Sequence, residues 1–201
     1  MRGDSRYAAG FQSIFHRDVQ ADDVAFVLAS YVRSILAGAA PFDRYMNGEV
    51  AALSDDARRG LQLFRGKANC TACHAGPTFT DERFHNTGVA WVQNRREPSR
   101  ETRDSAQGAL ADLGRFVVSG KESDRGAFKT PTLREVARTA PYMHDGTLAT
   151  LDAVVEFYDG GGRVHPHLDS EIRPLRLTAG ERRDLVAFLK SLSGTIREGT
   201  Q

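Results

Sequence analysis

The sequence predicts an all-α fold with long loops between its helices. Apolar residues recur at the 3.6-residue period of a helix in four separate segments, and Ser, Thr or Asp residues precede these segments while glycines tend to follow them. Hydrophobic residues make up 40% of the 201 positions and charged residues 26%, which suffices for a packed core and argues against global disorder. The simplest division is one domain over residues 21–197, preceded over residues 1–20 by an arm or the remnant of another domain.

The first long helix is expected between Asp22 and Gly38. Acidic residues at its start favour the positive end of the helix dipole, and the glycine ends the apolar stripe. Within residues 1–20, Phe11 and Phe15 fit a short amphipathic turn.

A second helix is expected to begin after Ser54, whose hydroxyl suits a helix N-cap, and to end near Gly66. Residues 41–48 are expected to form a connector ahead of it. The helix carries Leu61 and Phe64 on one face and stops just before the most informative motif of the chain.

That motif is Cys-x-x-Cys-His, formed by Cys70, Cys73 and His74. Two cysteines at this spacing followed by histidine are the attachment signature of c-type haem, in which the thiols form thioether bonds and the histidine becomes a proximal axial ligand of the iron. The chain has only these two cysteines, so one covalent haem is expected. A redox-active Cys-x-x-Cys and a chance spacing are the alternatives. A helix that leads into this motif suits a cytochrome c-like domain.

The stretch after the motif is expected to be mostly loop, because Gly76 and Pro77 interrupt any helix. His85 is expected to be hydrogen bonded, with iron ligation as the lesser alternative, and Trp91 to be a core or rim residue. Residues 92–126 are the most polar part and read as a solvated loop with a short helix around 109–113.

Three further helices are expected toward the C-terminus. One opens at Pro131 and closes at residues 139–146; the next covers 150–158 with Tyr158 on its buried face; the last follows a capping box at 178–181. Between the last two, the His-x-His pair at 165–167 is expected to be solvated, with metal binding as the lesser alternative.

Function depends on the distal side of the iron. A thioether ligand would raise the reduction potential and suit an electron carrier, whereas a phenolate would favour ferric iron and an open position would admit peroxide. Met143, Tyr158 and the neighbouring His144 compete for this role. Chemistry and spacing alone favour Met143.

Charge and hydropathy exclude several classes of protein. The formal net charge of +1 and the absence of a basic, aromatic-rich block disfavour nucleic acid as a partner. No apolar run approaches the roughly 20 residues that span a bilayer. No signal peptide is visible, yet haem attachment to such motifs in bacteria implies a periplasmic location, so we expect a mature form or the downstream part of a longer product.

Several motifs together resemble the di-haem cytochrome c peroxidase/MauG family, and in particular its C-terminal haem domain. The resemblance extends from about residue 20 to 195 and rests on the segments 40–45, 57–64, 70–77, 84–88, 128–134, 139–146 and 150–151. It implies a cytochrome c-like fold, haem c and hydrogen peroxide-dependent oxidation.

The resemblance changes the ranking of distal ligands. Family peroxidases have a methionine near the end of the helix that begins Thr-Leu, and the MauG branch has a tyrosine there; the matching position is Tyr158. Met143 stays as the alternative. The family also implies Ca²⁺ held partly by backbone carbonyls, which would be those of Thr139 and Pro141.

Family enzymes carry a second Cys-x-x-Cys-His in an N-terminal domain, where peroxide is activated, and this chain has one such motif. The resemblance therefore implies a haem module that works with a second haem domain or chain and with a redox protein as donor or substrate. A stand-alone mono-haem electron carrier without peroxidase activity is the competing hypothesis, and a remnant that never receives haem is a third. We identify no catalytic residue from the sequence.

Overall fold

The computed structural model describes residues 4–89 and 113–197. Trp91 and the helix expected around 109–113 therefore lie outside the described residues, apart from Leu113. The described chain forms two compact units. The first contains the chain up to Gly38 and the segment from Thr195, and the second contains Ala39–Gly194. This division differs from the expected boundary at residue 20, which stays a prediction.

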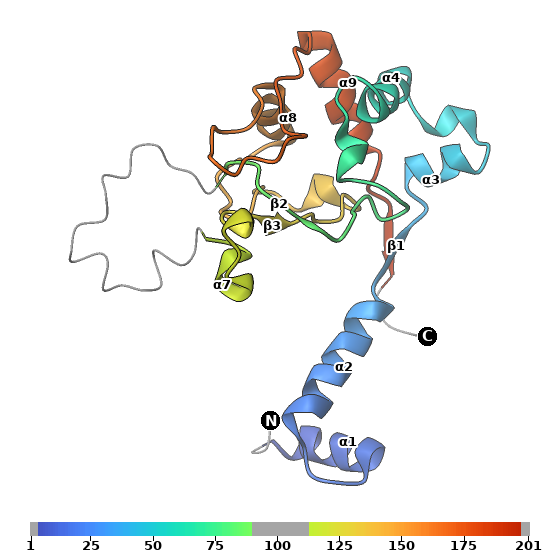
Figure 1. Cartoon of the computed structure of the whole chain (residues 1–201). Helices are drawn as coiled ribbons and strands as arrows, with labels where there is room; N and C mark the ends of the chain where they lie inside the picture. Colours follow the sequence, from blue (N-terminus) through green and yellow to red (C-terminus); the bar gives the residue numbers. More distant parts are fainter. Residues whose placement is uncertain (1–3, 90–112, 198–201) are drawn as a thin grey trace. The chain divides into compact units, whose positions relative to one another are not determined.

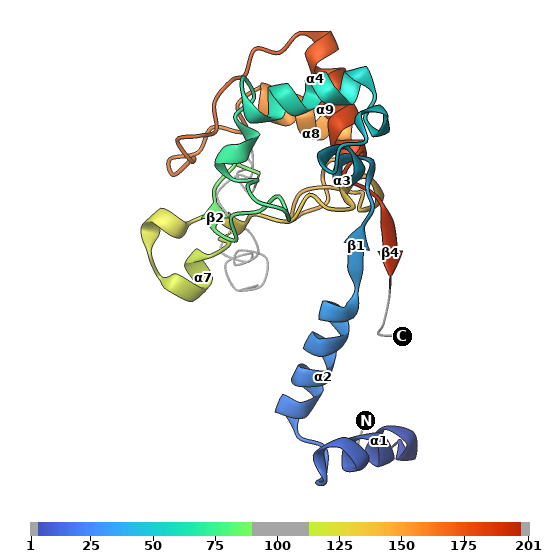
Figure 2. The same cartoon turned by 90° about the vertical axis from the view of Figure 1, so that its right-hand side faces the viewer.

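The first unit consists of two helices and a short ladder. Its elements are α1 (Ser5–Phe15), α2 (Ala21–Ser34), β1 (Leu36–Gly38) and β4 (Thr195–Arg197), and β1 pairs with β4 in antiparallel register (Figure 2). Helix α1 extends the short turn expected around Phe11, and α2 matches the first long helix expected from the sequence.

The second unit is built mainly from helices joined by long irregular segments (Figure 1). Its α-helices are α3 (Pro41–Met46), α4 (Asp55–Arg65), α7 (Phe116–Ser119), α8 (Leu151–Asp159) and α9 (Ala179–Lys190). Its 3₁₀ turns are η1 (Val50–Ala52), η2 (Cys70–Ala72), η3 (Glu122–Asp124) and η4 (Val136–Arg138). One short antiparallel ladder joins β2 (Phe84–His85) to β3 (Phe128–Lys129). The prediction of a helix-rich fold is confirmed.

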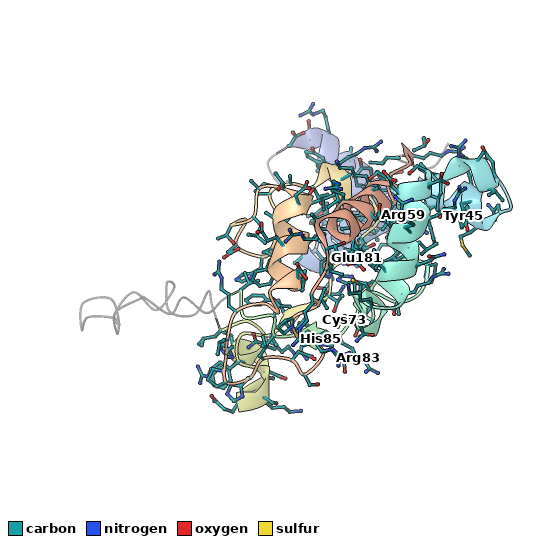
Figure 3. All side chains as sticks on the ribbon, turned by 90° about the horizontal axis from the view of Figure 1, so that it is seen from above. Tyr45, Arg59, Cys73, Arg83, His85 and Glu181 are labelled. Atoms are coloured by element: carbon teal, nitrogen blue, oxygen red, sulfur yellow. The ribbon has the colours of Figure 1, made fainter. Side chains whose placement is uncertain are left out.

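Helices α4 and α9 form the centre of the core. Gly60 lets the two backbones approach closely, since an added Cβ would lie 2.7 Å from the Cβ of Phe188. Ion pairs border this contact, from Arg59 to Asp184 at 2.9 Å and from Lys67 to Glu181 at 2.8 Å; Arg59 and Glu181 are labelled in Figure 3. Four phenylalanine rings pack together in the core beside these two helices, with neighbouring ring centroids 5.0–6.2 Å apart. They belong to Phe42, Phe64, Phe79 and Phe188.

The caps of α8 and α9 follow the sequence closely. Thr150 accepts a hydrogen bond from the backbone N–H of Ala153, and Thr178 forms the expected capping box with Glu181. These caps fix where the two helices begin.

Two local predictions are wrong. The segment expected as a connector contains α3, because Pro41 occupies its first turn and the Asp43 carboxylate accepts from the Ala40 N–H at 3.0 Å. The helix expected from Pro131 is absent among the described residues, and only the turn η4 forms there. Glu135 adopts a left-handed conformation, with φ of 60°, which a continuous α-helix does not allow.

Within the described ranges, no helix combines the length and apolar character needed to cross a membrane.

Candidate functional site

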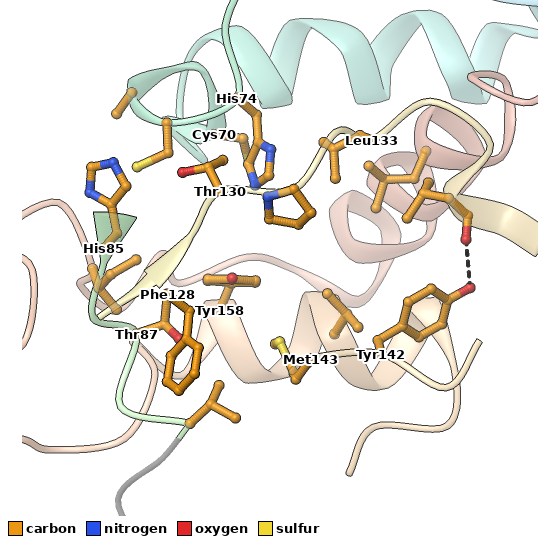
Figure 4. Close-up of a pocket in the computed structure, with 18 of the residues that line it drawn as sticks. Cys70, His74, His85, Thr87, Phe128, Thr130, Leu133, Tyr142, Met143 and Tyr158 are labelled. Atoms are coloured by element: carbon orange, nitrogen blue, oxygen red, sulfur yellow. Dashed lines mark hydrogen bonds between the residues drawn. The ribbon is translucent and has the colours of Figure 1, made fainter. Parts of the chain in front are cut away.

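A cavity of about 530 Å³ lies within the second unit, beside the Cys-x-x-Cys-His motif (Figure 4). Residues at and just after η2 form one wall, and α8 with the turn around residues 141–144 forms the facing wall. Every residue predicted to take part in the site lines this cavity: Cys70, Cys73, His74, Thr139, Pro141, Met143 and Tyr158. The fold thus brings together positions that are up to 88 residues apart in the sequence.

The motif is held in a single tight turn. Cys73 and His74 both donate backbone hydrogen bonds to the carbonyl of Cys70, at 3.3 and 2.9 Å. This turn directs two thiols and one imidazole to the same cavity. Such convergence is what double thioether attachment and proximal ligation of one haem require.

The His74 ring is oriented by a backbone oxygen. Its Nδ1 lies 2.8 Å from the carbonyl oxygen of Phe79, which can only accept, so Nδ1 carries the proton and Nε2 carries the lone pair. Burial lowers the pKa of His74, which keeps the imidazole neutral near pH 7. A neutral, oriented imidazole is suited to ligate iron.

The thiols do not resemble a redox-active pair. Burial raises the pKa of Cys70 to about 12 and that of Cys73 to about 11. Redox-active Cys-x-x-Cys motifs depend on a lowered pKa that makes the thiolate available. The raised values favour the haem-attachment interpretation over thiol redox chemistry.

The facing wall offers both predicted distal ligands. Tyr158 projects from α8, whereas Met143 projects from an irregular turn in which its own backbone is left-handed, with φ of 69° (Figure 4). Burial raises the pKa of Tyr158. A side chain on a capped helix is positioned more rigidly than one on a turn, so the geometry favours Tyr158.

Both nearby histidines have ring contacts of their own, and those of His85 occupy both of its nitrogens. The His144 ring stacks on Phe128, with centroids 3.6 Å apart and an interplanar angle of 13°. His85 lies between two carboxylates, with Nδ1 2.6 Å from Asp169 and Nε2 2.8 Å from Asp81. The expectation that His85 is hydrogen bonded is confirmed.

This His85 arrangement was not predictable from local patterns. Burial alone would lower the pKa of His85, but hydrogen bonds to Asp169 and Asp81 raise it above its ordinary value. A carboxylate beside each ring nitrogen suits the protonated ring, in which both nitrogens donate. Asp169 lies 84 residues further along the chain, and no motif links the two positions. His85 and Cys73 both line the cavity, and both are labelled in Figure 3.

The solvated histidine pair expected in the loop after α8 is wrong for one of its members. His165 is 8% exposed, and its Nδ1 accepts from the Asn86 side-chain amide at 2.9 Å. Elsewhere too, the described part of the chain gathers no group of three or more His, Cys, Asp or Glu that could hold a metal ion. Calcium at Thr139 and Pro141 would depend on backbone oxygens and stays a prediction.

The residues present fit haem c. The volume falls within the roughly 300–1,000 Å³ typical of ligand pockets, and most lining side chains are apolar. Arg173 adds a cationic group to the lining, which suits a ligand with carboxylates, whereas the ammonium of Lys129 pairs with Glu82 at 2.7 Å. The helices surround a cavity that is lined by a Cys-x-x-Cys-His motif. This combination is typical of helical domains that bind haem c.

Comparison with known proteins finds relatives of one kind. The sequence profile described as di-haem cytochrome c peroxidase matches residues 1–51. The chain is 42% identical to the cytochrome-c peroxidase IdrP1 of Denitromonas iodatirespirans, over 94% of this chain and 54% of that protein. It is 40% identical to the methylamine utilization protein MauG of Methylorubrum extorquens, over 92% of this chain and 49% of that protein. The chain is similar in sequence to members of the di-haem cytochrome c peroxidase/MauG family and spans about half the length of these relatives.

Solved structures show the same fold. A MauG-like protein associated with microbial copper homeostasis superposes with a TM-score of 0.63 at 34% identity, over 78% of this chain and 52% of that chain. The diheme peroxidase BthA of Burkholderia thailandensis gives a TM-score of 0.57 at 26% identity, over 77% of this chain and 46% of that chain. In both cases, as with the sequence relatives, the match spans about half of the larger protein.

Proposed function

We propose that this chain is a haem-c module of a hydrogen peroxide-dependent oxidoreductase, with Cys70 and Cys73 attaching one haem covalently and His74 as proximal ligand. The observation that carries the proposal is the convergence of this motif and Tyr158 on facing walls of one cavity. Haem c supplies one-electron redox chemistry when bound. The chain's residues attach it, orient it and exclude water from it.

Tyr158 is proposed as the distal ligand. Its phenol is neutral while no cation is near, because burial raises its pKa, and binding to ferric iron would require loss of that proton. An anionic oxygen ligand stabilises the ferric state and lowers the reduction potential. The side chain would therefore hold the iron oxidised and six-coordinate, which leaves no open position for peroxide.

This ligand set suits storage or relay of oxidising equivalents more than activation of peroxide. The module would then depend on a second haem domain or chain to react with hydrogen peroxide, and on a redox protein as electron donor or oxidised substrate. The relatives named cytochrome-c peroxidase and MauG support this assignment. A periplasmic location follows from the proposal, since bacteria attach c-type haem outside the cytoplasmic membrane.

A second candidate function is a stand-alone electron-transfer cytochrome. The observation in its favour is that Met143 lines the same cavity as Tyr158. A thioether ligand would raise the reduction potential and favour simple electron transfer.

We also propose that the backbone carbonyls of Thr139 and Pro141 bind Ca²⁺. Removal of Ca²⁺ by a chelator should then alter the haem spectrum reversibly.

The proposed function is tested by haem content and peroxide turnover of the chain expressed with haem-attachment machinery. We expect a mass increase of one haem, lost in Cys70→Ala/Cys73→Ala, and at most slow oxidation of a reduced donor cytochrome by peroxide. Turnover should rise at least about tenfold when the remaining half of the D. iodatirespirans relative is fused ahead of residue 1. A chain that carries no haem contradicts the proposal, and one that is high-potential and inert in the fusion supports the electron carrier instead.

A further inference from the structure

The loop after the Cys-x-x-Cys-His motif orients His74 through an unfavourable backbone conformation. Phe79, whose carbonyl accepts from Nδ1 of His74, is left-handed, with φ of 55°. This region disfavours any residue with a side chain, because the Cβ comes too close to the following carbonyl oxygen. The loop therefore needs contacts from elsewhere in the chain to keep that carbonyl in place.

Hydrogen bonds with the irregular segment 130–134 supply part of this support. The Thr132 hydroxyl donates to the carbonyl of Thr78 at 2.6 Å, and the Thr80 hydroxyl donates to the carbonyl of Thr130 at 2.7 Å. The second of these bonds is buried, so water competes little with it. In place of the helix expected there, the segment thus fastens the loop on both sides of the Phe79 carbonyl.

Arg134 ties the same loop to helix α3. Its Nε donates to the carbonyl of Pro77 at 2.9 Å, and its Nη1 donates to the carboxylate of Asp43 at 2.7 Å. The guanidinium also lies over the rings of Phe79 and Phe42, 5.2 and 5.7 Å from their centroids. Because the side chain is only 18% exposed, these contacts are largely shielded from water.

The position of Arg134 separates its effect from direct contact with a ligand. Thr132 and Leu133 line the cavity, but Arg134 does not. The guanidinium therefore reaches His74 through the loop. A lysine would keep the charge, but its compact ammonium lacks the rigid planar fork that donates in two directions while its face covers a ring.

We propose that Arg134 is a positioning residue for His74, which fixes the loop that carries the Phe79 carbonyl and thereby strengthens the hydrogen bond from Nδ1 of His74. The inference rests on the proposed ligation of iron by His74. A proximal imidazole with a firm Nδ1–H bond is a more basic ligand, and such a ligand stabilises ferric iron and lowers the reduction potential. Arg134 thus supports the oxidised state that storage of oxidising equivalents requires.

Arg134→Lys in the haem-loaded chain tests the proposal, because it keeps the charge and removes the fork. We expect the midpoint potential to rise, with the ferrous-to-ferric ratio at a fixed electrode potential increasing roughly three- to tenfold; tenfold corresponds to about 59 mV for a one-electron couple. The Nδ1 proton of His74, followed by NMR of the ferrous protein, should exchange with water at least about tenfold faster. Amide exchange in α9 should stay the same, which separates this effect from a general loss of stability.

Arg44→Lys is the matched control. Arg44 lies next to Asp43 in α3 and pairs with Glu49 at 3.2 Å, with the two side chains 50% and 54% exposed. The same substitution at this exposed pair should change neither the potential nor the proton exchange. Thr132→Val gives a second test that does not depend on the folding of Arg134→Lys. It removes the hydroxyl that holds Thr78, at an exposed residue, and should raise the potential by a smaller amount.

The outcomes distinguish this proposal from the proposed function. A potential and a proton exchange like those of the wild type in both Arg134→Lys and Thr132→Val would overturn the positioning role, and so would an equal shift in Arg44→Lys. Either result would leave the proposed function intact, because the wild type would still carry one haem ligated by His74. A wild type that acquires no haem would overturn both.

Discussion

At the scale of single residues, the orientation of His74 depends on a backbone oxygen that substitution cannot remove. The carbonyl of Phe79 accepts from Nδ1, and the Phe79 ring packs in the phenylalanine cluster under α9. The backbone of Phe79 therefore orients the His74 imidazole, while the ring of the same residue fills the core. The motif itself was readable from the sequence, but this coupling was not, because it depends on where the chain returns after the motif.

The ion-paired His85 leads to a pH-dependent prediction. Its pKa is raised in the folded state above 6.5, so the stability it contributes is complete below that pH and is lost as the pH rises through the raised value. The pKa of Asp81 is lowered to about 2, since hydrogen bonds from Arg83 and His85 outweigh burial; its contribution is present above 3.8 and is lost as the pH falls toward 2. The cluster should stabilise the fold most between about pH 4 and 6.5.

Thermal unfolding of the haem-loaded chain and of His85→Gln should show this window. We expect the variant to lower the melting temperature by several degrees at pH 5 and by clearly less at pH 9. His16→Gln, at an exposed histidine, should show the same small difference at both pH values. A pH-independent effect of His85→Gln would contradict the ion-pair interpretation.

At the scale of secondary-structure elements, the contact between α4 and α9 supports the whole second unit. An added Cβ at Gly60 would overlap with the backbone oxygen of Asp184 and press on Phe188. Because backbone cannot rotate away as a long side chain can, the two helices would have to separate.

Gly60→Ala should therefore destabilise the protein by roughly 3 kcal/mol, although alanine is the better helix former. Gly180→Ala in α9 is the matched control, since the nearest atom to its added Cβ lies 3.8 Å away, and it should be neutral or stabilising by up to about 1 kcal/mol. Denaturant unfolding of both variants measures the difference. Equal stability of the two would show that the close approach of α4 and α9 does not matter.

At the scale of the whole molecule, the two units differ in how well their apolar residues are covered. The second unit buries its cluster around α9, whereas Leu28, Tyr31 and Val32 of α2 are each more than half exposed. In the chain alone, limited chymotrypsin digestion should cut first at Phe26, Leu28 or Tyr31 and leave a resistant haem-bearing fragment that begins near Ala39. Mass spectrometry of the first products checks this; a first cut within α8 or α9 would contradict it.

Local patterns predicted much of this molecule, and the failures share one physical cause. Caps and periodicity located α8 and α9 because these signals lie within one helix. The helix expected from Pro131 did not form, since Glu135 adopts a backbone set by tertiary contacts, among them the bond from the Gly194 N–H to its carboxylate at 2.7 Å. The hydrogen bond from His85 to Asp169 likewise joins segments far apart in the chain.

The central claim is that His74 and Tyr158 are the axial ligands of one covalently attached haem. It is tested most directly by optical and EPR spectra of the ferric protein beside Tyr158→Phe and Met143→Ala. We predict a six-coordinate wild type, a changed ligand field in Tyr158→Phe and an unchanged spectrum in Met143→Ala. If Tyr158→Phe matches the wild type and Met143→Ala alone changes the spectrum, the tyrosine assignment is wrong and the protein is a His/Met electron carrier.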